Sequence, residues 1–114
     1  MRLAHIRTVM KLREKNRGNV PLVAAIDRLI NDLEQNDFEN FEQLKELRPD
    51  ADRVHNDGFC FLNLNVHRTM VLFHFGADGV ARFVWAGTHQ EYEATFKNNK
   101  NTIEKWLRRK GMIN

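Results

Sequence analysis

The stretch VARFVWAGTHQEYEATF, from Val80 to Phe96, contains both a predicted strand and the predicted start of a helix. Apolar and other side chains alternate from Val80 to Trp85, and this period of two indicates a strand with one buried face. The strand is predicted to end at Ala86-Gly87. The residues that share the predicted buried face are Ala81, Phe83 and Trp85.

The helix that follows this strand is predicted from a capping box. Thr88 is followed three residues later by Glu91, so each side chain can accept a free backbone N–H at the start of a helix. The helix then begins at His89, and Tyr92 lies on the same face one turn later. An imidazole and a phenol beside the end of a sheet form a candidate catalytic pair, although the same spacing also occurs in purely structural helix starts.

Two amphipathic helices are predicted in residues 1–36, which form a helical hairpin. Apolar residues recur at helical spacing over residues 3–16, and Gly18 ends that helix. A second helix starts at Asn19 or Val20, with Pro21 in its first turn. A short turn between two such helices predicts an antiparallel pair with one apolar surface. The apolar stripe of the second helix consists of Leu22, Val23, Ile26, Leu29, Ile30 and Leu33.

The rest of the chain predicts a short helix, a sheet and further helices. Residues 40–48 form a helix that Asn40 caps and Pro49 ends. Residues 53–86 then show strand periodicity interrupted by turn signals, and residues 68–75 are apolar enough for a central strand. Residues 88–110 are predicted C-terminal helical segments, the last of them capped by Asn101 with Glu104. The predicted fold class is therefore α+β, with the N-terminal helical hairpin packed on a three- or four-stranded antiparallel sheet.

Length, charge and cysteine content limit the classes of protein to which this chain can belong. A chain of 114 residues with 42% hydrophobic content predicts a single domain over residues 1–114. The net charge is only +3, but residues 1–17 and 97–110 are basic and residues 32–46 are acidic. Such a basic surface suits RNA or an acidic partner, or is simply solvated. The single cysteine, Cys60, lies in an apolar run and is predicted to be a buried small hydrophobic residue.

Several classes of protein and site have no support in the sequence. No segment has the pattern of a signal peptide or the length of a membrane span, so we expect a cytoplasmic protein without membrane contact. The five histidines form no H-E-x-x-H motif and no cluster with cysteine, so no metal is expected. The chain also lacks G-x-S-x-G, Walker A and G-x-G-x-x-G motifs, so no nucleotide or other cofactor is expected.

A second group of candidate residues lies on the predicted central strand. Arg68 and His74 occupy the two ends of one strand face, with Met70 and Leu72 between them. Arg82 on the neighbouring strand can join them at a cleft. The alternative is that His74 is an ordinary half-buried histidine and that Arg68 is a solvated charge at the end of the strand.

Three stretches resemble a known family. Residues 87–93, GTHQEYE, resemble the G-T-H-x-E-Y-D signature of HigB-type toxins in the RelE/ParE toxin superfamily, with Glu93 in place of aspartate. Residues 44–52, LKELRPDAD, resemble that family's L-K-x-x-x-P-x-A-D stretch. Residues 63–69 keep the asparagines and the Arg of its N-x-K-G-N-x-Y-R-L hairpin but lack the Lys-Gly pair. The resemblance covers roughly residues 22–96.

The resemblance implies a RelE-like fold and a toxin of a type II toxin-antitoxin system. The implied activity is metal-independent, ribosome-dependent cleavage of mRNA by attack of the ribose 2′-hydroxyl on the adjacent phosphate. His89 is then the candidate base or acid, Tyr92 orients it or stacks on a base, and Arg68 binds the phosphate. The expected RNA-binding residues are Lys45, His74, Arg82 and Glu93.

The same resemblance implies partners and leaves two alternatives open. The expected partners are a cognate HigA-like, DNA-binding antitoxin, mRNA and the ribosome. A ParE-like toxin shares the fold but binds a topoisomerase without cutting RNA, and a non-catalytic RNA-binding protein needs only the basic surfaces. The basic segment 97–114 lies outside the resemblance and can serve in core packing, RNA contact or antitoxin docking.

Overall fold

Alternating apolar residues between Asp52 and Gly87 build four of the five strands of one sheet, as the computed structural model of residues 1–114 shows. The strand order is β1-β5-β4-β3-β2, so the apolar strand β4 lies in the centre, as predicted. Strands β2 to β5 pair antiparallel in an unbroken meander, and β1 pairs parallel with β5. The bounds are β1 Arg2–Ala4, β2 Asp52–His55, β3 Phe59–Leu64, β4 His67–His74 and β5 Val80–Gly87.

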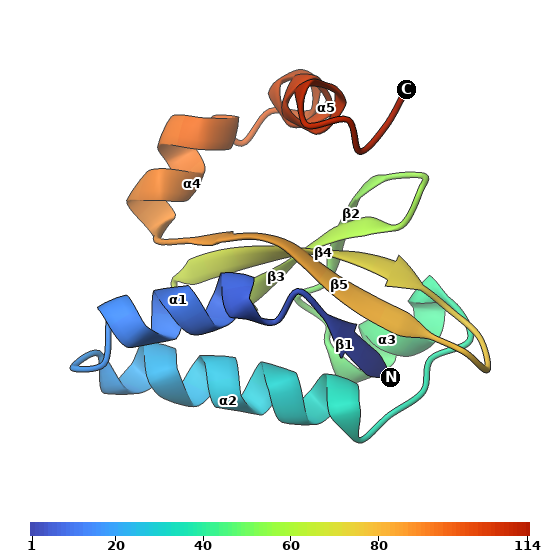
Figure 1. Cartoon of the computed structure of the whole chain (residues 1–114), viewed down its shortest axis with the longest axis horizontal. Coiled ribbons are helices and arrows are strands. Elements are labelled where there is room, and N and C mark those ends of the chain that lie inside the picture. Colours follow the sequence, from blue (N-terminus) through green and yellow to red (C-terminus); the bar gives the residue numbers. More distant parts are fainter.

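Three helices cover one face of this sheet. They are α1 (Arg7–Lys15), α2 (Val20–Glu34) and α3 (Phe41–Leu47), and α1 and α2 form the predicted hairpin (Figure 1). The stripe on α2 faces the sheet because its side chains recur at helical spacing. The fully buried members of the stripe are Leu22, Ile26, Leu29 and Leu33, each with 0% exposure. We call the buried cluster on this face the aliphatic layer.

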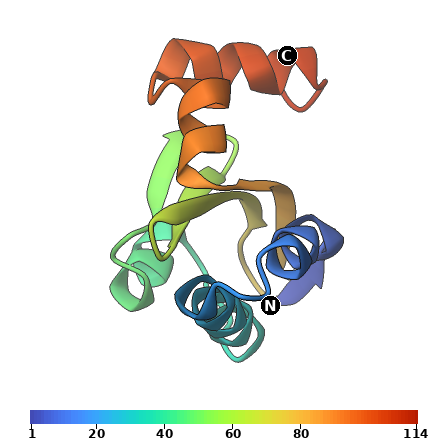
Figure 2. The ribbon, with the colours of Figure 1, turned by 90° about the vertical axis from the view of Figure 1, so that its left-hand side faces the viewer.

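Two further helices cover the opposite face. They are α4 (His89–Phe96) and α5 (Lys100–Arg109). Seen end-on, the sheet lies between the α1–α2 hairpin on one side and α4 with α5 on the other (Figure 2). We call the buried cluster on this face the aromatic layer because rings dominate it. Its buried members are Val54, Phe59, Phe61, Met70, Tyr92, Phe96, Ile103, Trp106 and Leu107. The α+β class is confirmed.

The N-terminal residues correct one prediction. The predicted helix over residues 3–16 begins only at Arg7, because residues 2–4 form β1 and give the sheet a fifth strand. The Arg2 N–H donates to the Gly79 carbonyl at 3.1 Å, so the strand gains backbone hydrogen bonds along β5. The N-terminal ammonium group also donates to the Leu33 carbonyl at 2.9 Å. His5 then turns the chain with a φ of 55°.

A β-bulge corrects a second prediction. Met70 pairs with Trp85 but Val71 pairs with Phe83, so Val84 is an extra residue in β5. One extra residue reverses the alternation, so Trp85 cannot share a face with Ala81 and Phe83 as predicted. Instead the Trp85 ring packs in the aromatic layer, where its centroid lies 5.0 Å from that of Phe96.

The predicted starts of α2, α3 and α4 agree with the structure, and α2 begins at Val20 after its cap Asn19. The capping box of Thr88 and Glu91 is present, and Asn40 caps α3 by accepting the Gln43 N–H at 2.9 Å. The predicted Asn101 cap of α5 is wrong. Asn99 caps this helix instead, because the chain turns sharply just before it, with a left-handed Asn98 of φ 46°. No helix in the chain is both long enough and apolar enough to span a membrane.

Candidate functional site

The candidate site lies where three elements meet: the start of β4, the end of β5 and the start of α4. A two-residue turn, with Asn65 in the left-handed region at φ 61°, joins β3 to β4 and ends at His67. Arg68 then pairs with Gly87, the last residue of β5. The strand pairing therefore places Arg68 next to the start of α4.

Gly87 allows this junction to be tight. A Cβ atom at this position would lie 2.6 Å from the Trp85 ring and 3.2 Å from the Glu91 Cβ. Only glycine therefore lets the end of β5, the Trp85 ring and α4 approach this closely. The capping box fixes the first turn of α4, because the Glu91 carboxylate accepts the Thr88 N–H at 2.8 Å.

The half-buried Arg68 guanidinium is held by two hydrogen bonds and two aromatic rings. Its Nη1 donates to the Tyr92 hydroxyl at 3.1 Å, and its Nε donates to the Asn63 side-chain oxygen at 3.3 Å. Its carbon lies 4.8 Å from the Tyr92 ring centroid and 5.4 Å from that of Phe61. A guanidinium has five N–H groups, so most of them remain free to donate to an anion.

Tyr92 belongs to the aromatic layer, with 4% of its surface exposed. Its hydroxyl donates to the Asn98 side-chain oxygen at 2.9 Å while it accepts from Arg68. Burial raises the pKa of the Tyr92 hydroxyl, and the nearby Arg68 charge only partly offsets that effect. The hydroxyl is therefore protonated at neutral pH and acts as a hydrogen-bond donor rather than a base.

His89 lies at the exposed first position of α4, with 60% of its side chain accessible. Its Nε2 lies 3.9 Å from the Glu93 carboxylate one turn along the helix. Its backbone N–H donates to the Nδ1 of His67 at 2.9 Å, which brings a second imidazole to the site. The Tyr92 hydroxyl bonds to Arg68 and Asn98 rather than to His89.

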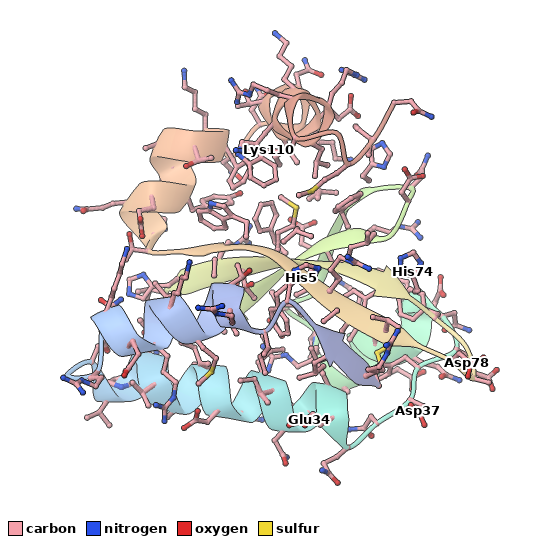
Figure 3. The ribbon with its side chains drawn as sticks, viewed as in Figure 1. His5, Glu34, Asp37, His74, Asp78 and Lys110 are labelled. Carbon is pink, nitrogen blue, oxygen red and sulfur yellow. The ribbon has the colours of Figure 1, made fainter.

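The structure does not bring the other predicted site residues to this cluster. His74 lies at the far end of β4, six positions along the strand from Arg68 and therefore about 20 Å away. Arg82 lies near that end, where its Nη1 donates to the His5 Nε2 at 3.0 Å. His5, His74 and Arg82 line a separate hollow of about 480 Å³. Figure 3 labels His5 and His74. Lys45 donates to the Ala51 carbonyl at 2.8 Å beside the sheet edge at β2.

Sequence reasoning assigned no role to three residues that shape the site. His67 contacts the start of α4, Asn63 holds Arg68, and Asn98 accepts from Tyr92. The position of His67 next to Arg68 was the one signal in the sequence. Asn63 and Asn98 gave none, because their contacts depend on strand register and on a left-handed turn.

The Cys60 thiol has no part in this site. Burial raises the pKa of the Cys60 thiol to about 12, so it carries no thiolate at neutral pH. Its predicted burial is confirmed. No group of three His, Cys, Asp or Glu side chains lies close enough together to hold a metal ion.

The fold and the site together define a class of protein. A helical hairpin on one face of a mostly antiparallel sheet, with arginine, tyrosine and histidine at a strand-to-helix junction, is consistent with a RelE-like toxin. The family model HigB_toxin, described as the RelE-like toxic component of a toxin-antitoxin system, matches residues 23–95. The match spans more than half of the chain, so the protein belongs to this family, and a cognate antitoxin is implied. A comparison with curated proteins gave no match.

Proposed function

We propose that this toxin is an endoribonuclease that cleaves mRNA on the translating ribosome, in the cytoplasm. The observation that carries the proposal is the meeting of Arg68, Tyr92 and His89 at one junction, where a cation and an imidazole are accessible beside a fixed helix start. Cleavage of RNA needs a cation for the phosphate charge and a group that moves protons. The cluster supplies both.

The reaction begins when the ribose 2′-oxygen attacks the adjacent phosphorus. The bond from the 2′-oxygen to phosphorus forms while the bond to the 5′-oxygen of the next nucleotide breaks, which leaves a 2′,3′-cyclic phosphate and a 5′-hydroxyl. His89 takes the proton from the 2′-hydroxyl, and the Glu93 carboxylate at 3.9 Å stabilises the resulting imidazolium. The departing 5′-oxygen takes a proton from water, and the hydroxide that remains takes the proton from His89, which restores the neutral imidazole.

Arg68 and Tyr92 act on the phosphate. The planar guanidinium of Arg68 suits two phosphate oxygens at once, and the charge that develops in the transition state strengthens those bonds. Tyr92 is a positioning residue, because its buried hydroxyl and ring hold the guanidinium from one side. Asn63 holds it from the other side.

Mutation of His89 tests the proton-transfer role. His89→Ala should lower the cleavage rate by roughly 10² to 10⁴-fold, the usual contribution of general acid-base catalysis, while the fold stays intact. Gln90→Ala is the matched control, because Gln90 is the next exposed residue of the same helix turn. The measurement is the rate of appearance of new mRNA 5′ ends, with purified ribosomes present or absent. Full cleavage by His89→Ala would remove this residue from the mechanism.

Expression in bacteria separates this function from the alternatives. Growth arrest accompanied by new mRNA 5′ ends supports an endoribonuclease. Growth arrest without new ends would favour a ParE-like toxin that binds a topoisomerase. RNA binding with neither effect would favour a non-catalytic RNA-binding protein.

A further inference from the structure

A groove of about 650 Å³ runs between α1 and the end of β5. In Figure 1 the last part of β5 passes between α1 on one side and α4 on the other. The Thr8 hydroxyl fastens α1 to β5 by donating to the Phe83 carbonyl at 3.4 Å. We call this hollow the α1 groove. Its floor is formed by residues 84–86 of β5, and Glu91 of α4 and the capping residue Thr88 close one end.

One wall of the α1 groove carries a regular row of positive charge. Arg7, Lys11 and Lys15 all line it and are spaced four residues apart on α1. Each is exposed, and none forms an ion pair. Four residues of helix rise by about 6 Å, comparable to the separation of successive phosphates along an extended single strand. The one acid in the lining, Glu91, has its carboxylate occupied by the capping box.

The floor of the groove offers an aromatic surface. Trp85 lines it and is half-buried, so part of the indole remains accessible. A row of cations beside an accessible aromatic ring is the combination with which proteins bind single-stranded nucleic acid, through phosphate contacts and base stacking.

Both ends of the groove reach candidate RNA-contacting residues. Thr88, at one end, directly precedes His89. At the other end the groove shares Thr8 and Val84 with the hollow that His5, His74 and Arg82 line. The two hollows therefore lie next to each other along β5.

We propose that the α1 groove binds the mRNA strand next to the cut, with phosphates on Lys11 and Lys15 and a base on Trp85. This inference rests on the proposed function, because that function places the reacting phosphate at Arg68 and His89. The α1 helix lies outside residues 23–95, so the family match does not include this wall. The even spacing of the cations and the accessible ring favour RNA over an acidic protein segment.

The test is the binding of a 15-nucleotide single-stranded RNA, made non-cleavable by 2′-O-methylation and followed by fluorescence anisotropy. The double variant Lys11→Gln/Lys15→Gln should bind at least tenfold more weakly. The plot of log affinity against log salt concentration should become shallower by about 1.4 in slope. Each of the two phosphates that the variant no longer neutralises accounts for about 0.7. The matched control is Lys105→Gln/Arg109→Gln, which removes two exposed cations four residues apart on α5. The control should change affinity less than twofold.

Tryptophan fluorescence provides an independent readout. Stacking of a base should quench Trp85, whereas Trp106 belongs to α5 and is buried in the aromatic layer. RNA should therefore quench the wild-type protein, and Trp85→Phe should remove most of the quenching. Absence of quenching in the wild-type protein would overturn the stacking contact.

The outcomes separate this inference from the cleavage proposal. If Lys11→Gln/Lys15→Gln keeps wild-type affinity and salt slope, the α1 groove does not bind RNA, whatever His89→Ala does to cleavage. If this double variant keeps its RNA affinity but loses affinity for the antitoxin, the groove is a protein-binding surface and the inference fails. If RNA binds in the groove but no cleavage occurs on ribosomes, the proposed endoribonuclease fails and the groove stands.

Discussion

The two layers that cover the sheet are built from different side chains. The aliphatic layer holds sixteen buried residues, of which only Phe38, Phe73 and Phe83 are aromatic. The aromatic layer holds nine, and five of them carry rings: Phe59, Phe61, Tyr92, Phe96 and Trp106. Aliphatic side chains offer only packing, whereas rings also hold a cation on their faces. The candidate site accordingly lies on the aromatic layer, where Arg68 contacts Tyr92 and Phe61.

The two layers therefore have different roles: the aliphatic layer stabilises the fold, and the aromatic layer carries the candidate site. The aliphatic layer seals α2 against the sheet, and the exposed fraction of Ile26 is 0%. The aromatic layer leaves half-buried edges, where Arg68 and Trp85 meet the solvent. Changes in the first layer should therefore act on folding, and changes in the second should act mainly on the site.

The largest expected effect is on the aliphatic layer. Ile26→Asp places a carboxylate where no side chain can pair with it, and it should lower the free energy of unfolding by about 3 kcal/mol or more. Urea denaturation followed by circular dichroism measures the loss. Ala24→Asp on the exposed face of the same helix should stay close to wild type. A wild-type denaturation curve for Ile26→Asp would show that this layer does not hold the fold.

The aliphatic layer was also the more predictable of the two from the sequence. Its helix stripe has a regular period, and the capping residues Asn19 and Asn40 act on neighbours within one turn. Local patterns of this kind predicted α2, α3 and a meander of three or four strands, of which the structure has four. The strand β1 was missed because its pairing partner, β5, lies almost eighty residues away in the chain.

The candidate site was only partly predictable, for a similar reason. The motif around His89 and Tyr92 marked the junction, but periodicity carries no information about a bulge. The bulge at Val84 is what turns Trp85 into the aromatic layer. Arg68 was identified from its place at a strand end, whereas its contact with Tyr92 depends on the register between β4 and β5.

A second prediction concerns an ion network that ties the two layers together. Arg48 donates to Asp50 at 2.9 Å, and the Asp50 carboxylate accepts the Asn63 N–H at 2.8 Å. Asn63 in turn accepts from Arg68 in the candidate site. Burial opposes ionisation of Asp50, but the hydrogen bonds from Arg48 and Asn63 outweigh it and lower the pKa of the carboxyl. The segment that follows α3, with Arg48 and Asp50, thus helps to position Arg68 through Asn63.

Asp50→Asn should therefore lower the free energy of unfolding at pH 7 by about 2 kcal/mol, the range for hydrogen bonds to charged groups. Because the pKa of Asp50 is lower in the folded chain, its stabilisation is present above about pH 4 and is lost as the pH falls through the folded pKa. The free energy of unfolding, measured from denaturation curves between pH 7 and pH 2, should therefore change less with pH in the variant than in the wild type. Asp78→Asn, in the exposed loop before β5, is the control. Equal acid sensitivity of wild type and Asp50→Asn would contradict the network.

The smallest expected effect is on the aromatic layer itself. Tyr92→Phe keeps the ring against Phe61, whose centroid lies 5.1 Å away, and removes only the hydroxyl. The loss of the hydrogen bonds to Arg68 and Asn98 should cost about 1 kcal/mol of unfolding free energy. Cleavage should fall far less than in His89→Ala, since Arg68 still lies over the ring and is held by Asn63.

The dependence of stability on pH above about pH 8 distinguishes a titrating hydroxyl at Tyr92 from a mere packing contact. We call this part of the curve of stability against pH the alkaline limb. Burial raises the pKa of Tyr92 in the folded chain, so the unfolded chain loses its proton first. The wild-type protein should therefore lose stability as the pH rises from about 10 toward the folded pKa, and Tyr92→Phe should lack that part of the loss. Denaturation midpoints between pH 8 and about 11 measure it. A cleavage loss as large as that of His89→Ala, with an unchanged alkaline limb, would instead place the hydroxyl in the proton path and remove its positioning role.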